Sequence, residues 1–262
     1  MIFIGVNGAT GKMGSLVCKR ILFESDMSLT EAFENPKNEY LNKDLGLSLG
    51  IEEWKLNISV LEKTNKYKFN VLIDFSSPEG LSSAIDYCSS NRIPLVSGTT
   101  GLSESKMQLL EETSKSIPVL YSTNMSTGIN SILLALDSLK DILKDEERDI
   151  EIIEYHHNQK KDAPSGTALT LADKIAGISK RKIETGGNTK YPRGNEIRIH
   201  SLRIGAIPGY HKVIISGKGE TIELSHSAES RETFANGAIR GARFIAGKKK
   251  GLYKMTDVLK EK

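Results

Sequence analysis

The first 125 residues alternate short apolar runs with amphipathic segments, and this alternation restricts the possible folds more than any other feature of the sequence. One run, residues 71–75, reads Val-Leu-Ile-Asp-Phe and is apolar almost throughout. Nearly continuous apolar strands separated by helices are typical of a parallel sheet with helices on both faces. The expected strands are residues 2–6, 29–33, 71–75, 93–97 and 119–121, and the expected helices are 12–23, 78–90 and 104–116.

The pattern changes near Ser126. Strand-like runs then follow one another without intervening helices, and Gly217-Lys218-Gly219 has the composition of a hairpin turn. Consecutive strands of this kind predict a mixed or antiparallel sheet, and hence a second, α+β domain. The expected strands are 150–155, 196–204, 212–216 and 221–225, and the expected helices are 129–144, 167–178 and 231–246. We also expect a surface loop at 179–194 and a short tail at 252–259.

A glycine-rich loop connects the first expected strand to the first expected helix. Gly8, Gly11 and Gly14 form a GxxGxxG variant of the dinucleotide-binding fingerprint, whose glycines allow a tight turn and close approach of a pyrophosphate. The helix N-terminus then presents backbone amides to the phosphates. Glu34 ends the second strand-like run, where a carboxylate can accept hydrogen bonds from ribose hydroxyls. We therefore expect a Rossmann-type dinucleotide-binding domain. An ordinary strand–helix turn with a surface glutamate is the alternative, and the spacing excludes a P-loop.

The residues after Glu34 bear on cofactor preference. A carboxylate at this position repels the 2′-phosphate of NADP, and NADP sites usually place an arginine nearby. This chain continues with Asn35, and Lys37 is the nearest cation. We expect NADH to be the preferred cofactor, with NADPH as the second choice.

Composition excludes several classes of protein. The chain of 262 residues has 36 Lys and Arg against 33 Asp and Glu, and a net charge of +3 is too small for a nucleic-acid binder. Cys18 and Cys88 lie in expected helices without metal-ligand spacing, which predicts buried thiols in a reducing compartment. The N-terminal residues do not resemble a signal peptide, and no apolar stretch reaches the roughly 18 residues of a membrane span. We expect a cytoplasmic protein without nucleic-acid or membrane partners.

The most specific part of the sequence is residues 154–168, Glu-Tyr-His-His-Asn-Gln-Lys-Lys-Asp-Ala-Pro-Ser-Gly-Thr-Ala. His156 and His157 lie where a strand is expected to end, Lys160 follows, and Ser165 is placed to cap the next helix. The helix N-terminus, the hydroxyls and the lysine can bind an anion, and histidine and lysine can exchange protons. This combination suits a small substrate that carries carboxylates.

Three other interpretations of these residues remain open. The adjacent histidines could bind a metal, but neighbours on a strand point to opposite faces and the usual ligand spacing is missing, so we expect no metal. The pair could be structural, with one ring buried and one exposed. The charges of residues 160–162 could belong to a solvated loop.

Together with the N-terminal GxxGxMG, the run Glu-x-His-His-x-x-Lys-x-Asp-Ala-Pro-Ser-Gly-Thr-Ala closely resembles the 4-hydroxy-tetrahydrodipicolinate (dihydrodipicolinate) reductase family of the diaminopimelate route to lysine. The resemblance covers nearly the whole chain, and the double-histidine run is highly specific to the family. Further matching segments are Asp74-Phe75 with Pro78-Glu79-Gly80, Gly98-Thr99-Thr100-Gly101, Asn124 with Ser126 and Gly128-Ile129-Asn130, and Thr233 to Ala238.

The resemblance implies roles for individual residues. His156 matches the family's proposed acid/base histidine, and Lys160 matches the lysine proposed to protonate the substrate nitrogen. The positions that hold the substrate's carboxylates are His157, Ser165, Gly166 and Thr167. The positions that contact the cofactor are Gly8, Ala9, Thr10, Gly11, Lys12, Met13, Glu34, Gly98, Thr99, Thr100, Ser122, Thr123, Asn124 and Met125. Asn35 departs from the arginine of many members, which weighs against NADP.

The resemblance also implies a domain organisation. A dinucleotide-binding domain would span residues 1–125, a substrate-binding and oligomerisation domain 126–235, and residues 236–262 would return to the first domain. The family's central domain mediates formation of a homotetramer.

The function implied by the resemblance is that of an oxidoreductase. It would reduce 4-hydroxy-tetrahydrodipicolinate to tetrahydrodipicolinate with NAD(P)H in lysine biosynthesis. Another two-domain dehydrogenase with a small carboxylated substrate shares the glycine loop but does not explain residues 156–167. A non-catalytic dinucleotide sensor and a metal hydrolase that uses His156 and His157 are the remaining alternatives.

Overall fold

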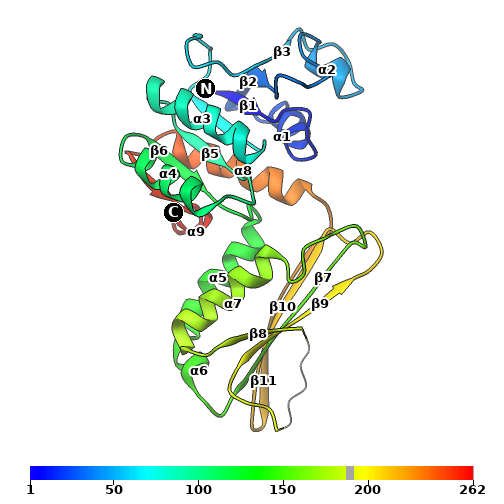
Figure 1. The fold of residues 1–262 in the computed structure, drawn as a ribbon, viewed down its shortest axis with the longest axis vertical. Coiled ribbons are helices and arrows are strands. Elements are labelled where there is room, and N and C mark those ends of the chain that lie inside the picture. Colours follow the sequence, from blue (N-terminus) through cyan, green and yellow to red (C-terminus); the bar gives the residue numbers. More distant parts are fainter. Residues whose placement is uncertain (187–191, 262) are drawn as a thin grey trace. The chain divides into compact units, whose positions relative to one another are not determined.

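The protein divides into two compact units (Figure 1). The computed structural model describes residues 1–186 and 192–261. Unit 1 consists of Met1–Thr127 and Glu232–Lys262, and unit 2 is Gly128–Arg231. The domain limits expected after residues 125 and 235 therefore lie within a few residues of the limits of the units. The second expected limit falls inside helix α8 (Glu232–Ile245), which belongs to unit 1 over its whole length.

Unit 1 contains a parallel sheet in the order β12-β6-β5-β4-β1-β2-β3. All neighbouring strands in it are parallel, as expected from the alternation of strands and helices. The order reverses between β4 and β1, which is the switch point where open α/β sheets bind ligands. The strands are β1 (Ile2–Asn7), β2 (Met27–Phe33), β3 (Ile58–Ser59), β4 (Val71–Asp74), β5 (Leu95–Ser97), β6 (Pro118–Tyr121) and β12 (Gly251–Tyr253).

Helices cover both faces of this sheet. Along β4, Val71 and Ile73 point into one core and Leu72 into the other, because successive side chains of a strand alternate between its faces. The first core also contains α1 (Gly14–Ile21), α8 and α9 (Met255–Lys260), and the second contains α3 (Pro78–Asn91) and α4 (Glu104–Ser114). Cys18 on α1 and Cys88 on α3 are buried free thiols, as predicted.

Unit 2 contains a mixed sheet in the order β11-β10-β7-β9-β8. The pairs β7–β9 and β8–β9 are parallel, whereas β10 is antiparallel to both β7 and β11. One face packs against the helices α5 (Thr127–Ser138), α6 (Lys140–Lys144) and α7 (Gly166–Ser179). The strands are β7 (Asp149–His156), β8 (Ile183–Thr185), β9 (Ile197–Arg203), β10 (Gly209–Gly217) and β11 (Glu220–Ala228). A Rossmann-type unit and an α+β unit with a mixed sheet confirm the expected fold class.

Several elements differ from the sequence predictions. The single helix expected at 129–144 is two helices, α5 and α6, because Leu139 leaves the helical conformation with ψ +18°. The segment expected as a loop, 179–194, contains β8, and its residues 187–191 lie outside the described part of the chain. The expected tail at 252–259 is β12 followed by α9. By contrast, the polar and weakly periodic segment 35–57 is a loop with the short helix α2 (Leu45–Ser48), in agreement with its expectation of a loop or short helix. No helix within residues 1–186 and 192–261 is long and apolar enough to span a membrane.

Candidate functional site

The residues expected to bind the cofactor follow the carboxyl ends of four strands of unit 1. The glycine loop follows β1, Glu34 follows β2, Gly98–Thr100 follow β5 and Ser122–Met125 follow β6. Because these strands are parallel, their carboxyl ends lie at one edge of the sheet. The predicted cofactor residues are thus brought to the same edge, on both sides of the switch point between β1 and β4.

The glycine loop has a backbone that requires glycine. Gly8 has φ +79°, and a Cβ atom there would lie 2.6 Å from the carbonyl oxygen of Phe75. The amides of Gly8 and Ala9 donate to the carbonyl of Phe33, and the amide of Gly11 donates to the carbonyl of Gly8. The loop is therefore held by backbone hydrogen bonds within itself and to the end of β2, and its bare backbone can approach a pyrophosphate closely.

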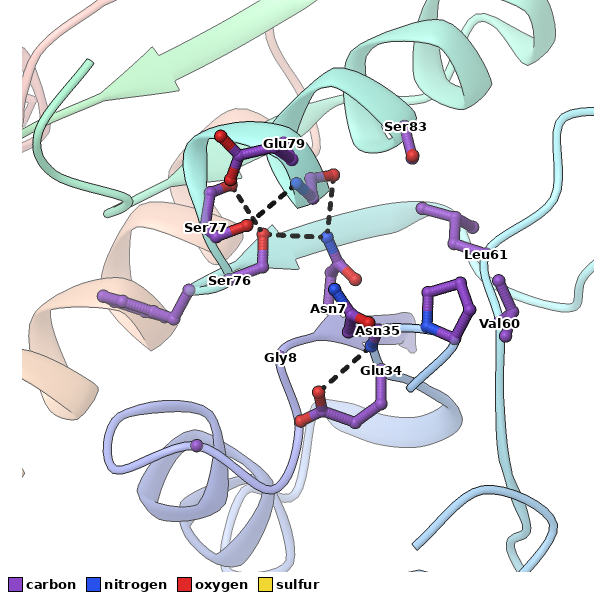
Figure 2. A pocket seen from close by; sticks show the side chains of 14 residues that line it. Asn7, Gly8, Glu34, Asn35, Val60, Leu61, Ser76, Ser77, Glu79 and Ser83 are labelled. Carbon is purple, nitrogen blue, oxygen red and sulfur yellow. Dashed lines mark hydrogen bonds between the residues drawn. The ribbon is translucent and has the colours of Figure 1, made fainter. Parts of the chain in front are cut away.

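Glu34 is held against the glycine loop. Its Oε1 accepts hydrogen bonds from the amide of Thr10 (2.8 Å) and from Thr10 Oγ1 (2.7 Å). Its Oε2 accepts from the amide of Asn35 (3.2 Å). Glu34 and Asn35 line a cavity of about 360 Å³, whose wall also includes the glycine loop and the segment around the start of α3 (Figure 2). The size and the lining fit part of a dinucleotide.

Asp74, at the end of β4, connects the strand ends around this cavity. Its Oδ1 accepts from Asn7 Nδ2 (2.8 Å) and Ser76 Oγ (2.5 Å), and its Oδ2 accepts from Ser97 Oγ (2.9 Å) and Thr99 Oγ1 (2.7 Å). Burial raises the pKa of Asp74, although these hydrogen bonds oppose the rise. The carboxyl group ties the ends of β1, β4 and β5 together, and Thr99 with them.

The other predicted cofactor residues differ in exposure. Lys12, Thr100 and Thr123 are exposed, whereas Ala9, Thr99 and Met125 are buried. A residue whose side chain is buried can contact a cofactor only through its backbone, or can help indirectly by holding its neighbours in place. After β6 the chain turns on side-chain hydrogen bonds, in which Ser122 Oγ donates to the carbonyl of Asn124 and Asn124 Oδ1 accepts from the amide of Ser126.

In unit 2 the double-histidine run ends strand β7. The buried face of β7 has Ile150 and Ile152 and then continues with Glu154 and His156. Glu154 is completely buried, and its Oε2 lies 2.6 Å from His156 Nδ1. Arg203 on β9 binds both Glu154 oxygens, with Nη1 to Oε2 at 3.1 Å and Nη2 to Oε1 at 2.9 Å. The apolar period of the strand therefore ends in a buried cluster of charged and ionisable groups.

This environment keeps Glu154 ionised. Burial alone would raise its pKa, but hydrogen bonds from His156, Arg203, Ser201 and the amide of Ser165 outweigh it and lower the pKa to about 2. At neutral pH Glu154 is thus an acceptor only, and both of its oxygens are used.

Ser165 caps α7 as predicted. Its Oγ accepts from the amide of Ala168 (3.2 Å) and lies 3.1 Å from His211 Nε2 on β10. Its amide donates to Glu154 Oε1 at 3.1 Å. Ser165 is only 2% exposed, whereas Gly166 at the start of the helix is exposed. The backbone at the N-terminus of α7 is therefore exposed at the surface, whereas the capping residue Ser165 is buried and held by its hydrogen bonds.

Lys160 and His157 follow β7 in the loop that leads to α7. Lys160 Nζ forms an ion pair with Asp162 Oδ1 at 2.8 Å, and the amide of Lys160 donates to the carbonyl of His157. The amide of His157 donates to the carbonyl of Ile207, which fixes the start of the loop. Unit 2 thus brings His156, Ser165 and Glu154 into one cluster, with Lys160 in the connecting loop.

His211 is a further member of the cluster, one that the sequence did not reveal. It is 3% exposed, and burial together with the neighbouring His156 lowers its pKa to about 3, so it is neutral at physiological pH. Its ring centroid lies 5.1 Å from that of His156 in an edge-to-face arrangement. Gly209, two residues earlier, leaves room for His156, because a Cβ atom there would lie 2.9 Å from His156 Nε2.

One group of possible metal ligands occurs among the described residues. Oxygen and nitrogen atoms of Glu154, His156 and His211 lie within 4.8 Å of one another. Both oxygens of Glu154 already accept hydrogen bonds from Arg203, whose positive charge opposes a second cation. The donor set therefore fits a hydrogen-bonded cluster better than a metal site. His157, the other half of the expected histidine pair, is not a member of the group.

Sequence reasoning missed Glu154, Arg203, His211 and Asp74 as members of the sites. Glu154 had a signal, because it lies two residues before His156 and so shares the buried face of the strand. Arg203 and His211 come from other strands, and only the register of the sheet brings them to β7.

Comparisons with known proteins match both units. A family model described as dihydrodipicolinate reductase, N-terminus, matches residues 2–125, and one described as dihydrodipicolinate reductase, C-terminus, matches residues 128–259. A 4-hydroxy-tetrahydrodipicolinate reductase of Caldanaerobacter subterraneus subsp. tengcongensis is 41% identical, over 100% of this chain and 99% of the relative. The enzyme of that name from Clostridium novyi is 40% identical, over 98% of each chain.

Solved structures show the same fold. The dipicolinate-bound dihydrodipicolinate reductase of Paenisporosarcina sp. TG-14 superposes with a TM-score of 0.75 at 24% identity, covering 97% of each chain. The DAP dehydrogenase of C. glutamicum, in complex with DAP, gives a TM-score of 0.59 at 14% identity and covers 100% of this chain and 96% of the other. The resemblance found in the sequence motifs is confirmed by matches that cover both units: the chain belongs to the dihydrodipicolinate reductase family.

Proposed function

We propose that the protein reduces 4-hydroxy-tetrahydrodipicolinate to tetrahydrodipicolinate with NADH or NADPH, in the diaminopimelate route to lysine. The observation that carries this proposal is the arrangement of His156 on β7 and Ser165 at the N-terminus of α7 around one buried carboxylate, Glu154. This pairs a proton-transfer group with an anion-binding helix end, as a carboxylated substrate that gains a hydride and a proton and loses its hydroxyl group as water requires. The names of relatives about 40% identical over the whole chain support the same substrate.

Unit 1 fits a nicotinamide dinucleotide. The backbone of residues 8–13 would hold the pyrophosphate at the start of α1, and Glu34 would accept from the adenosine ribose. The segments Gly98–Thr100 and Ser122–Met125, at the ends of β5 and β6, would hold the nicotinamide half. When bound, the reduced nicotinamide supplies the hydride.

Unit 2 would bind the substrate and move the proton. The exposed backbone of Gly166 and the side chains of Thr167 and His157 would hold the carboxylates at the N-terminus of α7, with Ser165 supporting them from below. Lys160 would attract the dianionic substrate and donate a proton to its nitrogen after release from Asp162. His156 would act as general acid or base, or would stabilise developing charge.

NADH is the cofactor that we propose to be preferred. The carboxylate of Glu34 lines the cavity beside the neutral Asn35, and the side chain of Asn35 is engaged by the amide of Lys37 at 2.9 Å. A 2′-phosphate would meet a negative charge there without an arginine to bind it. Comparing kcat/KM for NADH and NADPH tests this preference, and a large preference for NADPH would contradict it.

We further propose a homotetramer in the cytoplasm, on the basis of the family resemblance and of two free thiols that fit a reducing compartment. Light scattering of the purified protein measures the oligomer directly.

The reductase activity has a direct assay. The substrate is unstable, so dihydrodipicolinate synthase would generate it in situ while the loss of NADH absorbance is followed. We expect turnover with the wild type and a loss of kcat with Lys160→Ala. Turnover of NADH with other carboxylated imines but not with this substrate would favour another dehydrogenase instead.

A further inference from the structure

Among the residues of unit 2 that the structure describes, Glu154 is the most enclosed charged one, and the proposed reaction gives it no direct contact with substrate. It is completely buried, on a face of β7 where Ile150 and Ile152 precede it and His156 follows it. A buried ionised carboxylate is costly unless every lone pair facing the protein has a donor. Its partners therefore indicate what it does.

The two oxygens of Glu154 have different partners. Oε2 faces the ring of His156, at 2.6 Å from Nδ1, and Oε1 accepts from the amide of Ser165 at 3.1 Å. Arg203 bridges the two oxygens from the third side. One carboxylate thus forms hydrogen bonds both to the ring of His156, which is expected to transfer protons, and to the first turn of α7, which is expected to bind the substrate's carboxylates.

The hydrogen bond to His156 fixes where the proton of the ring lies. An ionised carboxylate can only accept, so His156 Nδ1 must donate, and Nε2 is left as the atom that can exchange a proton with another group. The same logic operates in catalytic triads, where a buried carboxylate holds the histidine in one tautomer and orientation.

We propose that Glu154 is a positioning residue that fixes the tautomer and orientation of His156 and, through the amide of Ser165, the position of the first turn of α7. Arg203 holds Glu154 in place. The proposal rests on the proposed function, in which His156 and the N-terminus of α7 act on the same substrate. It adds that their spacing is set by a single carboxylate.

Glu154→Gln tests the proposal. The amide oxygen can still accept from the amide of Ser165 and from Arg203 Nη2. The amide nitrogen then loses the hydrogen bond from Arg203 Nη1 and faces His156 Nδ1, which must become the acceptor. The proton of His156 moves to Nε2, and we expect kcat to fall by on the order of 10²- to 10⁴-fold, as when the orienting carboxylate of a triad is replaced by an amide. The KM for NADH should stay within about twofold, because unit 1 is unchanged.

Glu151→Gln is a matched control on the same strand. Glu151 also accepts from a histidine, His200 Nε2 at 2.7 Å, and from an arginine, Arg193 Nη2 at 3.0 Å. It lies three residues before Glu154, outside the residues that we assign to the substrate. We expect its kcat to stay within about twofold of the wild type, so a general effect of losing a Glu–His–Arg cluster is separated from the specific role.

The ¹⁵N spectrum of histidine-labelled wild-type protein provides a second measurement that needs neither turnover nor a variant. At mildly alkaline pH we expect the His156 proton on Nδ1. A proton on Nε2, or a Glu154→Gln enzyme that folds and keeps its kcat, would overturn the proposal. Should the wild type fail to reduce the substrate, the proposed function fails, and the tautomer would still report on Glu154 alone.

Discussion

Gly209 illustrates how a single missing side chain shapes the site. Its Cβ position lies 2.9 Å from His156 Nε2, closer than side-chain atoms normally approach. Because the face of β10 that holds Gly209 is buried, an added methyl group cannot turn away into solvent. The ring of His156 or the strand must then shift.

We therefore expect Gly209→Ala to impair proton transfer more than folding. A displacement of the ring by a few tenths of an ångström should lower kcat by about tenfold or more, because misplacements on the order of 1 Å cost about 10². Steady-state kinetics with a thermal melt measures both effects. Gly219→Ala in the β10–β11 turn is the control for strain in this hairpin, since Gly219 has φ +90° and no neighbouring atom in the space of a Cβ. A normal kcat in Gly209→Ala would show that the ring has more room than the structure gives it.

His211 makes a pH-dependent contribution to stability. Its pKa in the folded protein is about 3, against an ordinary value of 6.5, so below pH 6.5 the unfolded chain binds a proton that the native state does not. Stability should therefore fall as pH decreases from about 6.5 towards 3, with a slope of up to about 1.4 kcal/mol per pH unit from this group. Glu154, with a folded pKa of about 2, acts in the same direction only below its ordinary value of 4.5.

The variant His211→Gln isolates this contribution. Glutamine can place a nitrogen near the position of Nε2 without binding a proton in the unfolded state. Urea unfolding of this variant between pH 7 and pH 5 should show a free energy of unfolding that depends less steeply on pH than that of the wild type. This window of about two pH units lies above the range in which Glu154 contributes. His226, whose pKa burial also lowers, contributes with the same sign in both proteins and cancels in the comparison. An equal slope in the two proteins would mean that His211 is protonated in the fold.

At the scale of elements, we expect the cap of α7 to link stability to binding at the proposed substrate site. Ser165→Ala removes the acceptor of the Ala168 amide and the partner of His211 Nε2. Loss of an N-cap costs about 1 kcal/mol. If the proposed substrate site takes dipicolinate, the ligand of the solved Paenisporosarcina reductase, the loosened first turn should also weaken its binding, measured by calorimetry.

Ser103→Ala is the control, because Ser103 caps α4 in unit 1 by accepting from the amide of Lys106. We expect it to lower stability without changing dipicolinate affinity. Equal dipicolinate affinity in Ser165→Ala and the wild type would show that the cap does not contribute to the binding site.

The sequence predicted elements well where their period was long enough to read. The strands and helices around the glycine loop were found because strand-like runs of five residues, 2–6 and 29–33, alternate with helical spacing. β3 has two residues and β12 has three, which is too short for any period, and only pairing with β2 and β6 identifies them. The same limit applies to the site: His156 and Lys160 lie in one motif, whereas Arg203 and His211 reach it through the register of β9 and β10 with β7.

At the scale of the whole molecule, unit 1 is made from two separate parts of the chain. The core that covers one face of its sheet includes Ile239 and Ile245 of α8 and Met255 and Val258 of α9, all buried. Each such side chain contributes about 1.5–3 kcal/mol when fully buried, and together they are comparable with the whole stability of a domain, about 5–15 kcal/mol. Residues 1–127 alone should therefore not fold.

Joining residues 1–127 to 232–262 through a short flexible linker, without 128–231, should restore the fold and the binding of NADH. The two segments supply the complete parallel sheet and both of its cores. Fluorescence titration with NADH should give saturable binding for the joined protein and none for residues 1–127. Gly8→Ala in the joined protein should abolish binding, because Gly8 has φ +79° and its Cβ would collide with the carbonyl oxygen of Phe75. If residues 1–127 alone bind NADH, α8 and α9 are dispensable to the cofactor site and unit 1 is smaller than its core indicates.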